Sequence, residues 1–554
     1  MRRLLALLLV GSCFAACGSE EGDGESGSVA AGVEEQLAYL HPDSALVVAI
    51  DLRYEAENWE SLRSIGGRIL DEARKDADPG DDVPADAEAA LTRYARVLNL
   101  SFEEDLRPVL DGRLVIGVAQ VPVRGDPPER VTVVYRTEGG DLQRLVEKTL
   151  DNSPLRPLPG RDDVVITSPE GIAVVGDDTL VAAETREEAI TAIERADAGE
   201  GFSTELIEAA ERGAGIDDPL LLATATPDLA AQFVDGVAVE RALSEVPYLG
   251  AVERVDLALD ASGDGVEARA QVATTGASLR PDQLPLGPAG EVELPRVERG
   301  VAGGSLDQSR ITTFAASVMR SLFADSEFVA AVEETERELG IRFEDEVLRQ
   351  FDCPSVSVFE PERGEPVGVD GRFSARSCVR DPERMRELLP ELAPRLPRIL
   401  RAMRGLSGEG LLGLLMLAPD APLSPGALLL QAGVAPLSGG ASGEQLYEVT
   451  GLRENDAGEE IFPGPDRVVF GMIGDDFVVG ADRQAARDAA ALETEPAGEQ
   501  AAAVLRVPPG VVGASLFGWD GAVPVLGRVF GDMEIGFSAD PRVTRAHARM
   551  PLAD

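Results

Sequence analysis

The sequence predicts an α+β protein of two related halves, each with a mainly antiparallel sheet covered by helices. Residues 171–196 and 467–492 share one plan: an apolar run, Gly-Asp-Asp, a second apolar run and a helix-patterned segment. Each half also closes with alternating apolar and polar residues, at 255–272 and 533–550, which is typical of hairpins with one buried and one wet face. At 554 residues the chain is too long for one core. We therefore expect an internal duplication.

The two Gly-Asp-Asp triplets are predicted to be tight turns between strands. Gly176 and Gly474 supply a permissive backbone for the turn. The paired aspartates can hydrogen-bond to neighbouring amides there; they are Asp177, Asp178, Asp475 and Asp476. A helix follows each second strand. Thr185 with Glu188 forms the pattern of a capping box in the first copy, and Asp482 is the expected N-cap in the second.

The other elements of the first half are expected in a simple order. A short helix, a buried strand and two long helices come first, at 33–40, 45–52, 59–75 and 85–98. A loop, short helix and strand, then a partner strand, then a helix that begins at an acidic residue follow at 98–121, 130–137 and from 141. Another strand, at 220–224, comes after the Gly-Asp-Asp unit.

The second half repeats this order. The segment from Phe343 to Glu346 (FEDE) matches the segment from Phe102 to Asp105 (FEED), and a strand follows each of them. A partner strand at 372–379, a helix that begins at Asp381 and a strand at 502–507 complete the correspondence.

An insertion interrupts the repeat in the second half. The step between the halves is 241 residues from Phe102 to Phe343 but 298 residues from Gly176 to Gly474, so about 57 extra residues lie between these points. They fall at about 394–442, a segment rich in leucine, glycine and proline. We expect a helical hairpin and a strand packed on the second half. The alternative is an apolar flap or a lipid-facing surface.

The N-terminus indicates export. Residues 1–3 are basic at positions 2 and 3, and residues 4–16 form an apolar run shorter than the roughly 20 residues of a membrane-spanning helix. The small residues before Cys17 resemble a bacterial lipobox, in which the cysteine is lipidated and becomes the new N-terminus. We therefore predict a lipid anchor at Cys17 on the outer face of the cytoplasmic membrane. A lipobox that ends at Cys13, an ordinary cleaved signal and a retained anchor are the alternatives.

Five divisions of the chain follow from these patterns. They are a signal peptide with its lipobox, a flexible acidic tether, a first repeat, a linker and a second repeat with the insertion, at 1–17, 18–32, 33–280, 281–300 and 301–554.

The charge of the chain restricts its partners. It has 98 acidic and 51 basic residues, a formal charge of −47. Such a field repels phosphate backbones and anionic headgroups, so nucleic acid is not an expected partner. Because the acidic residues are spread along the chain, we interpret them as a solvated surface; a face for cations or a basic partner is the alternative.

Two cysteines remain once the signal peptide and the lipidated residue are set aside. Cys353 precedes the apolar run 355–359 and Cys378 lies in the run 372–379, and these two runs would form an antiparallel hairpin. In this register the two cysteines lie nearly opposite each other, and export leads to an oxidising compartment. We predict a disulfide between them, which fits better than a zinc site because no histidine is near.

No catalytic or metal-binding pattern stands out. The two histidines, His41 and His547, lie at opposite ends of the chain, and no G-x-S-x-G motif is present. The glycine patterns at 22–27 and 408–413 do not follow a predicted strand, so they fail the context of a dinucleotide site. The calcium-like pattern from Asp260 has Gln271 where a bidentate glutamate is needed, so a hairpin turn is favoured. No cofactor, metal or catalytic residue is therefore predicted.

The lipobox, the opening segment LHPDSALVVAIDL, the paired long helices and the Gly-Asp-Asp unit together resemble the bacterial lipoproteins grouped as domain of unknown function family 3352. The resemblance covers most of the mature chain, and its motifs are architectural. It implies an extracytoplasmic, lipid-anchored protein and carries over no catalytic residue.

Three functions agree with these observations. We expect a non-enzymatic binding or scaffold protein of the cell envelope, whose partner is an envelope protein or an apolar small molecule. The second hypothesis is a carrier or sensor of an apolar envelope ligand, suggested by the leucine-rich insertion. The third is a hydrolase that depends on carboxylates, for which no particular acidic pair can be singled out.

Overall fold

The structure is a computed structural model. It describes residues 28–77, 83–119, 131–139, 141–150, 154–167, 171–231, 236–275, 279–297, 301–351, 353–360, 372–399, 402, 433–438, 443–451, 467–498, 500–509 and 523–553. Cys17, both glycine patterns and most of the insertion at 394–442 lie outside the described residues.

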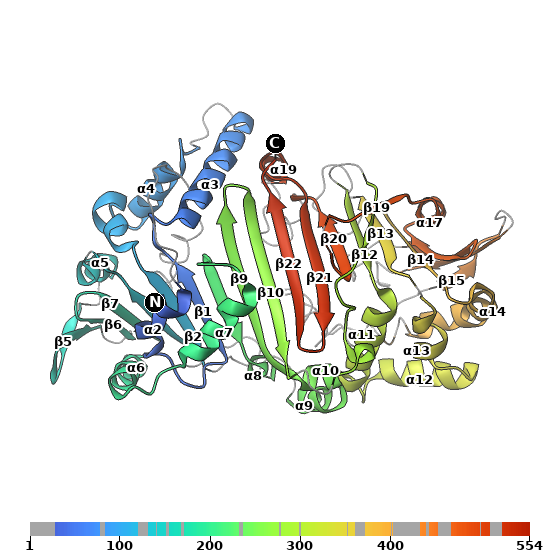
Figure 1. Cartoon of the computed structure of the whole chain (residues 1–554), viewed down its shortest axis with the longest axis horizontal. Coiled ribbons are helices and arrows are strands. Elements are labelled where there is room, and N and C mark those ends of the chain that lie inside the picture. The colour runs from blue at the N-terminus through green and yellow to red at the C-terminus, as the bar shows by residue number, and fades with distance from the viewer. Residues whose placement is uncertain are drawn as a thin grey trace.

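The described strands confirm an α+β fold with a large antiparallel sheet, which contains twenty of them and runs through the whole molecule (Figure 1). Ten come from the first part of the chain, in the spatial order β4 (Arg156–Leu158), β5 (Arg161–Ile166), β6 (Gly171–Val175), β7 (Thr179–Ala183), β3 (Val131–Arg136), β2 (Arg113–Val118), β1 (Leu46–Asp51), β8 (Leu221–Ala225), β9 (Val252–Ser262) and β10 (Gly265–Thr274).

The other ten strands come from the second part of the chain. Their spatial order is β22 (Val543–Pro551), β21 (Met533–Asp540), β20 (Ala503–Val507), β12 (Ala302–Leu306), β13 (Ser355–Glu360), β14 (Arg372–Cys378), β18 (Asp476–Gly480), β17 (Arg467–Ile473), β16 (Glu444–Thr450) and β15 (Gly433–Pro436). β10 pairs with β22 from Gly265 opposite Pro551 to Ala273 opposite Val543, and this pairing joins the two sets into one sheet.

Helices lie on both faces of the sheet around β1, where alternate side chains of the strand point to opposite faces. Val47 and Ala49 of β1 share one core with α2 (Val29–Leu37), α6 (Arg186–Ala198) and α7 (Thr204–Ala214). Ile50 faces the other side, where a second core includes residues of α3 (Glu57–Asp76), α4 (Ala87–Val97) and α5 (Leu142–Thr149). The strand segment 45–52 is therefore buried on both faces, as its continuous apolar run predicts.

The second set of strands has helices of its own. These are α11 (Gln308–Leu322), α12 (Glu327–Leu339), α13 (Phe343–Glu346), α14 (Pro382–Leu392) and α17 (Arg483–Ala490), with short turns at Leu348–Gln350 and Ala393–Arg395. α14 and α17 contribute to two cores that share strands β16 and β17, in which Met472 and Val478 are fully buried. In the first set, a π-helical turn at Phe102–Leu106 and a 3₁₀ turn at Arg107–Val109 lead into β2.

Two groups of helices cross between the two parts of the molecule. α8 (Pro227–Ala231), α9 (Gly236–Glu245) and α10 (Pro247–Gly250) precede β9, and Tyr248 of α10 packs edge-on against Phe314 of α11 with ring centroids 5.5 Å apart. In the other direction, α19 (Val523–Val529) from the C-terminal part lies against α3, where Arg528 pairs with Glu72 at 2.8 Å. The two parts are therefore in contact through these helices as well as through the β10–β22 pairing.

Two boundaries differ from the sequence expectation. The first helix begins at Val29 rather than residue 33, because Val29 and Ala30 are buried in the core. The tether expected at 18–32 would therefore end by residue 28. The segment 281–300, expected as a linker, is built into the fold over 281–297. It contains a 3₁₀ turn at Pro281–Gln283, and β11 (Glu293–Pro295) pairs with β19 (Thr494–Pro496). Leu284 and Leu294 in this segment are buried.

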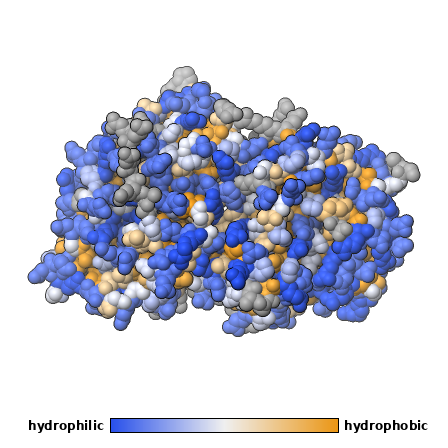
Figure 2. All heavy atoms as spheres, viewed as in Figure 1, coloured by the Kyte–Doolittle hydropathy of each residue, from blue (hydrophilic) through white to orange (hydrophobic). Residues whose placement is uncertain are grey.

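Among the described residues, no helix is long and apolar enough to cross a membrane. Figure 2 shows hydrophilic side chains over most of the visible face, with smaller apolar areas between them.

Candidate binding groove between α2 and α7

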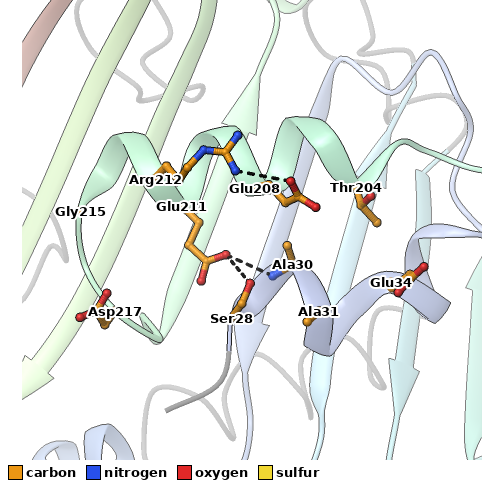
Figure 3. A pocket seen from close by; sticks show the side chains of 10 residues that line it. All are labelled: Ser28, Ala30, Ala31, Glu34, Thr204, Glu208, Glu211, Arg212, Gly215 and Asp217. Atoms are coloured by element: carbon orange, nitrogen blue, oxygen red, sulfur yellow. Dashed lines mark hydrogen bonds and ion pairs between the residues drawn. The ribbon is translucent and has the colours of Figure 1, made fainter.

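A groove with a volume of about 610 Å³ lies between α2 and α7, close to the point where the described chain begins (Figure 3). Its lining consists mainly of small and acidic residues: Ser28, Ala30, Ala31, Glu34, Thr204, Glu208, Glu211, Arg212, Gly215 and Asp217. The two helices are amphipathic and pack their apolar faces on the same core, so their polar faces form the walls.

Glu211 of α7 holds the first turn of α2. Its carboxylate accepts hydrogen bonds from Ser28 Oγ at 2.7 Å, from the Val29 amide at 2.9 Å and from the Ala30 amide at 3.4 Å. The first amides of a helix have no partner within the helix, and a negative charge there is favourable. Ser28 precedes the helix but makes no side-chain cap of its own, so α7 supplies the cap of α2.

The groove is electronegative. Four carboxylates and one guanidinium line it, so its formal charge is −3. Arg212 lies 3.4 Å from Glu208, one helical turn away, and Glu211 is engaged with α2 (Figure 3). A concave surface with this charge attracts ammonium and guanidinium groups.

An ionic network borders one end of the groove. Asp217 lines the groove, while its neighbour Asp218 forms ion pairs with Arg53 at 2.6 Å and with Arg113. Arg53 also pairs with Asp51, whose side chain is fully buried, and this hydrogen bond is the main cause that raises the pKa of Arg53. Each carboxylate of the network thus has an arginine partner, which a buried charge requires.

Asp260 on β9 lies near this network. Among the carboxyl groups of the described residues, its pKa is the one most clearly raised. Burial raises its pKa to about 6, with smaller contributions from the charges of Glu267, Asp218 and Glu57. Glu267 is its direct cross-strand partner on β10. Glu267 in turn contacts Arg269 at 2.5 Å and His547 Nε2 at 3.0 Å. Asp260 Oδ1 is buried and has no hydrogen-bond partner among the described residues, while a backbone hydrogen bond from Ala261 to this carboxyl partly offsets the rise in pKa.

The structure places the predicted turn residues away from the groove lining. Gly176 and Gly474 each come directly after a strand. Their backbone φ angles are positive, at 59° and 57°. In the first copy, three residues, Gly176 to Asp178, connect β6 to β7. In the second copy only Gly474 and Asp475 form the turn, because Asp476 already pairs with Ile473 as the first residue of β18.

Arginines hold both turns from neighbouring elements. Arg136 of β3 lies 3.1 Å from Asp178, and Arg386 of α14 lies 3.4 Å from Asp475. These ion pairs hold both turns in place and indicate a structural role for the aspartates.

Cys353 and Cys378 form a disulfide, with their Cα atoms 5.6 Å apart. It connects the residues just before β13 to the last residue of β14, which are neighbouring strands of the sheet. His41 lies in the loop before β1, and His547 lies on β22 opposite Arg269. Within the described ranges, no group of three or more His, Cys, Asp or Glu side chains is arranged to hold a metal ion.

Sequence reasoning missed the residues of the groove. Glu211 is one of many helical glutamates, and its role depends on amides 182 and 181 positions earlier in the chain. Asp218 carries a weak signal, since its φ of 48° places it in the left-handed region that aspartate tolerates better than most residues. Nothing in the sequence around Arg113 indicates that its side chain is buried beside α2.

No family model, curated protein or solved structure matches the chain.

Proposed function

We propose that this protein is a lipid-anchored, extracytoplasmic binding protein without enzymatic activity, and that the groove between α2 and α7 receives a cationic group. The observation that carries the proposal is the groove of about 610 Å³ with a formal charge of −3. A ligand with several amines, or a lysine-rich segment of an envelope protein, has the complementary charge.

The anchor would place this groove close to the membrane. Only ten residues lie between Cys17 and Ser28, where the groove begins, and an extended chain of this length spans at most about 40 Å. The groove would therefore face the space just outside the bilayer. The basic and apolar residues of the N-terminus and the small residues before Cys17 support export and lipidation.

The proposal includes an internal duplication. Its support is the strand order, which follows the same path from β4 to β10 as from β15 to β22. The groove has no counterpart in the described second half: β19 pairs with β11 there, in the part of the chain that corresponds to α7. Divergence of one half toward binding would explain this asymmetry.

Isothermal titration with spermidine at low ionic strength tests the groove. We expect Glu208→Gln and Asp217→Asn each to weaken binding by about threefold, because an exposed charge pair contributes up to about 1 kcal/mol. Added salt should weaken binding to the wild type. Glu205→Gln, an exposed acid on the same helix but outside the groove, is the matched control and should bind as the wild type does.

Equal spermidine affinity in all four proteins would contradict a role for the groove. The anchor is tested separately with Cys17→Ala, for which we expect loss of metabolic palmitate labelling and release from the membrane fraction. Unchanged labelling would contradict lipidation at this cysteine without affecting the groove.

A further inference from the structure

The middle of the sheet carries an apolar face made by four adjacent strands on both sides of the β10–β22 pairing. Residues opposite each other in an antiparallel pair point to the same face. The register therefore aligns three rows across β9, β10, β22 and β21. The rows are Val255, Val272, Thr544 and Ala539; Leu257, Ala270, Ala546 and Phe537; and Leu259, Ala268, Ala548 and Ile535.

Apolar side chains on this face remain open to solvent. Val255 and Leu257 are each 41% exposed, and Val97 is the only other large apolar side chain of the described residues that is exposed. Burial of apolar groups is normally the main driving force of folding. Two exposed apolar side chains in the middle of a sheet therefore indicate a surface that binds another molecule.

Described residues cover the two ends of the face, whereas no core cluster of the described residues includes its centre. At one end, Val266 and Met550 pack against the core that contains Trp59 of α3 and Val529 of α19. At the other end, Val272 and Phe537 pack against the core of Tyr248. Leu257, Leu259, Ala268, Ala270, Ile535, Ala546 and Ala548 belong to none of the core clusters formed by the described residues.

The face carries no charge. Eleven of its twelve positions are apolar, and the hydroxyl of Thr544 is hydrogen-bonded to that of Tyr248 at 2.6 Å. The chain as a whole has a formal charge of −47. A partner recognised by charge therefore has nothing to contact here, whereas a neutral hydrocarbon meets only apolar atoms.

Helices limit the width of the occupant. In Figure 1, α3 and α19 lie at one end of these strands and α9 and α10 at the other. The covered positions Val266 and Val272 are six residues apart on β10, about 20 Å at the rise of a strand. A stable protein interface buries about 800 Å² on each partner, so an apolar stretch this short suits a narrow hydrocarbon chain better than the surface of a folded protein.

From the charge-free lining, the exposed side chains and the flanking helices, we propose that this face binds the hydrocarbon chain of a neutral membrane lipid. The site is distinct from the groove between α2 and α7 and does not depend on a cationic ligand there. It would give the protein contact with a lipid independent of its own anchor.

The test uses the full chain in membranes of the expressing cell and a photoactivatable hexadecanol as probe. After illumination, we expect cross-links in peptides that contain 255–272 and 533–550. Leu257→Asp places a charge on the face and should reduce this cross-linking at least fivefold. Ala546→Leu occupies the centre without adding charge and should reduce it as well. Val97→Asp adds the same charge at an exposed apolar position on α4 and should leave cross-linking unchanged.

Three results would overturn the proposal. The first is cross-linking without enrichment on these strands, and the second is equal cross-linking in Leu257→Asp and the wild type. The third is an intermolecular disulfide in the variant Leu257→Cys, which would show that a second copy covers the face. Circular dichroism of each variant establishes that reduced cross-linking does not arise from unfolding.

Discussion

At the scale of single residues, Asp260 links the stability of the protein to pH. Burial raises its pKa to about 6 in the folded protein, whereas an aspartate in an unfolded chain titrates at about 3.9. The folded state therefore binds this proton more tightly. The contribution of Asp260 to stability improves as pH falls through about 6, and its penalty is fully present above that pH.

We expect Asp260→Asn to raise the free energy of unfolding at about pH 7.5 by about 1 kcal/mol. The full shift would correspond to about 3 kcal/mol, and partial exposure of the carboxyl reduces it. At about pH 5 the wild-type carboxyl is mostly protonated, so the difference should shrink. Urea unfolding followed by circular dichroism measures both values. Asp264→Asn, an exposed aspartate in the same hairpin, is the control. Parallel pH profiles of Asp260→Asn and wild type would refute this assignment.

At the scale of elements, α2 depends on α7 for its first turn. Glu211→Ala removes the acceptor of two α2 amides and of Ser28 Oγ. Loss of an N-cap costs about 1 kcal/mol, and the cost falls on the helix that would connect the fold to its anchor. We expect faster hydrogen exchange in residues 29–40, measured by mass spectrometry, with little change in α12.

Glu208→Ala on the same helix provides the matched comparison. Among the described residues its side chain pairs with the exposed Arg212 and not with α2, so its removal should leave exchange in α2 unchanged. Equal exchange in the Glu211 and Glu208 variants would show that the cap does not hold α2 in place.

At the scale of the whole molecule, the crossing helices make the two parts depend on each other. Tyr248 belongs to the chain of the first part, is 5% exposed, and packs against Phe314 and Thr544 of the second part. Tyr248→Ala should lower the free energy of unfolding by about 3–5 kcal/mol, as for other large aromatic residues in cores. Hydrogen exchange should rise in peptides of both parts together.

Tyr248→Phe separates packing from hydrogen bonding. It keeps the ring contact with Phe314 and loses the bond to Thr544, so we expect a loss of only about 1 kcal/mol. Faster exchange confined to one part of the molecule in Tyr248→Ala would instead show that the two parts unfold independently.

Most local features could be predicted from the sequence. The capping box of Thr185 and Glu188 is confirmed, as are the N-caps Asp482 and Asp381. Each of these interactions joins residues three positions apart, so the residue types at that spacing nearly determine the contact. The predicted helix start at residue 33 was wrong. The helix begins at Val29 because its first turn is buried against residues far along the chain.

The sequence by itself determined the α+β class, the order of strands and helices along the chain, and the positions of turns and caps. These depend on apolar periodicity and on contacts within a few residues. Only the tertiary structure decided that β10 pairs with β22, that residues 281–297 are packed, that Glu211 caps α2, and that Val255 and Leu257 stay exposed. The physical reason is that each of these results depends on contacts between residues far apart in the chain. A pattern within a few residues does not indicate which distant segment a strand or helix will contact.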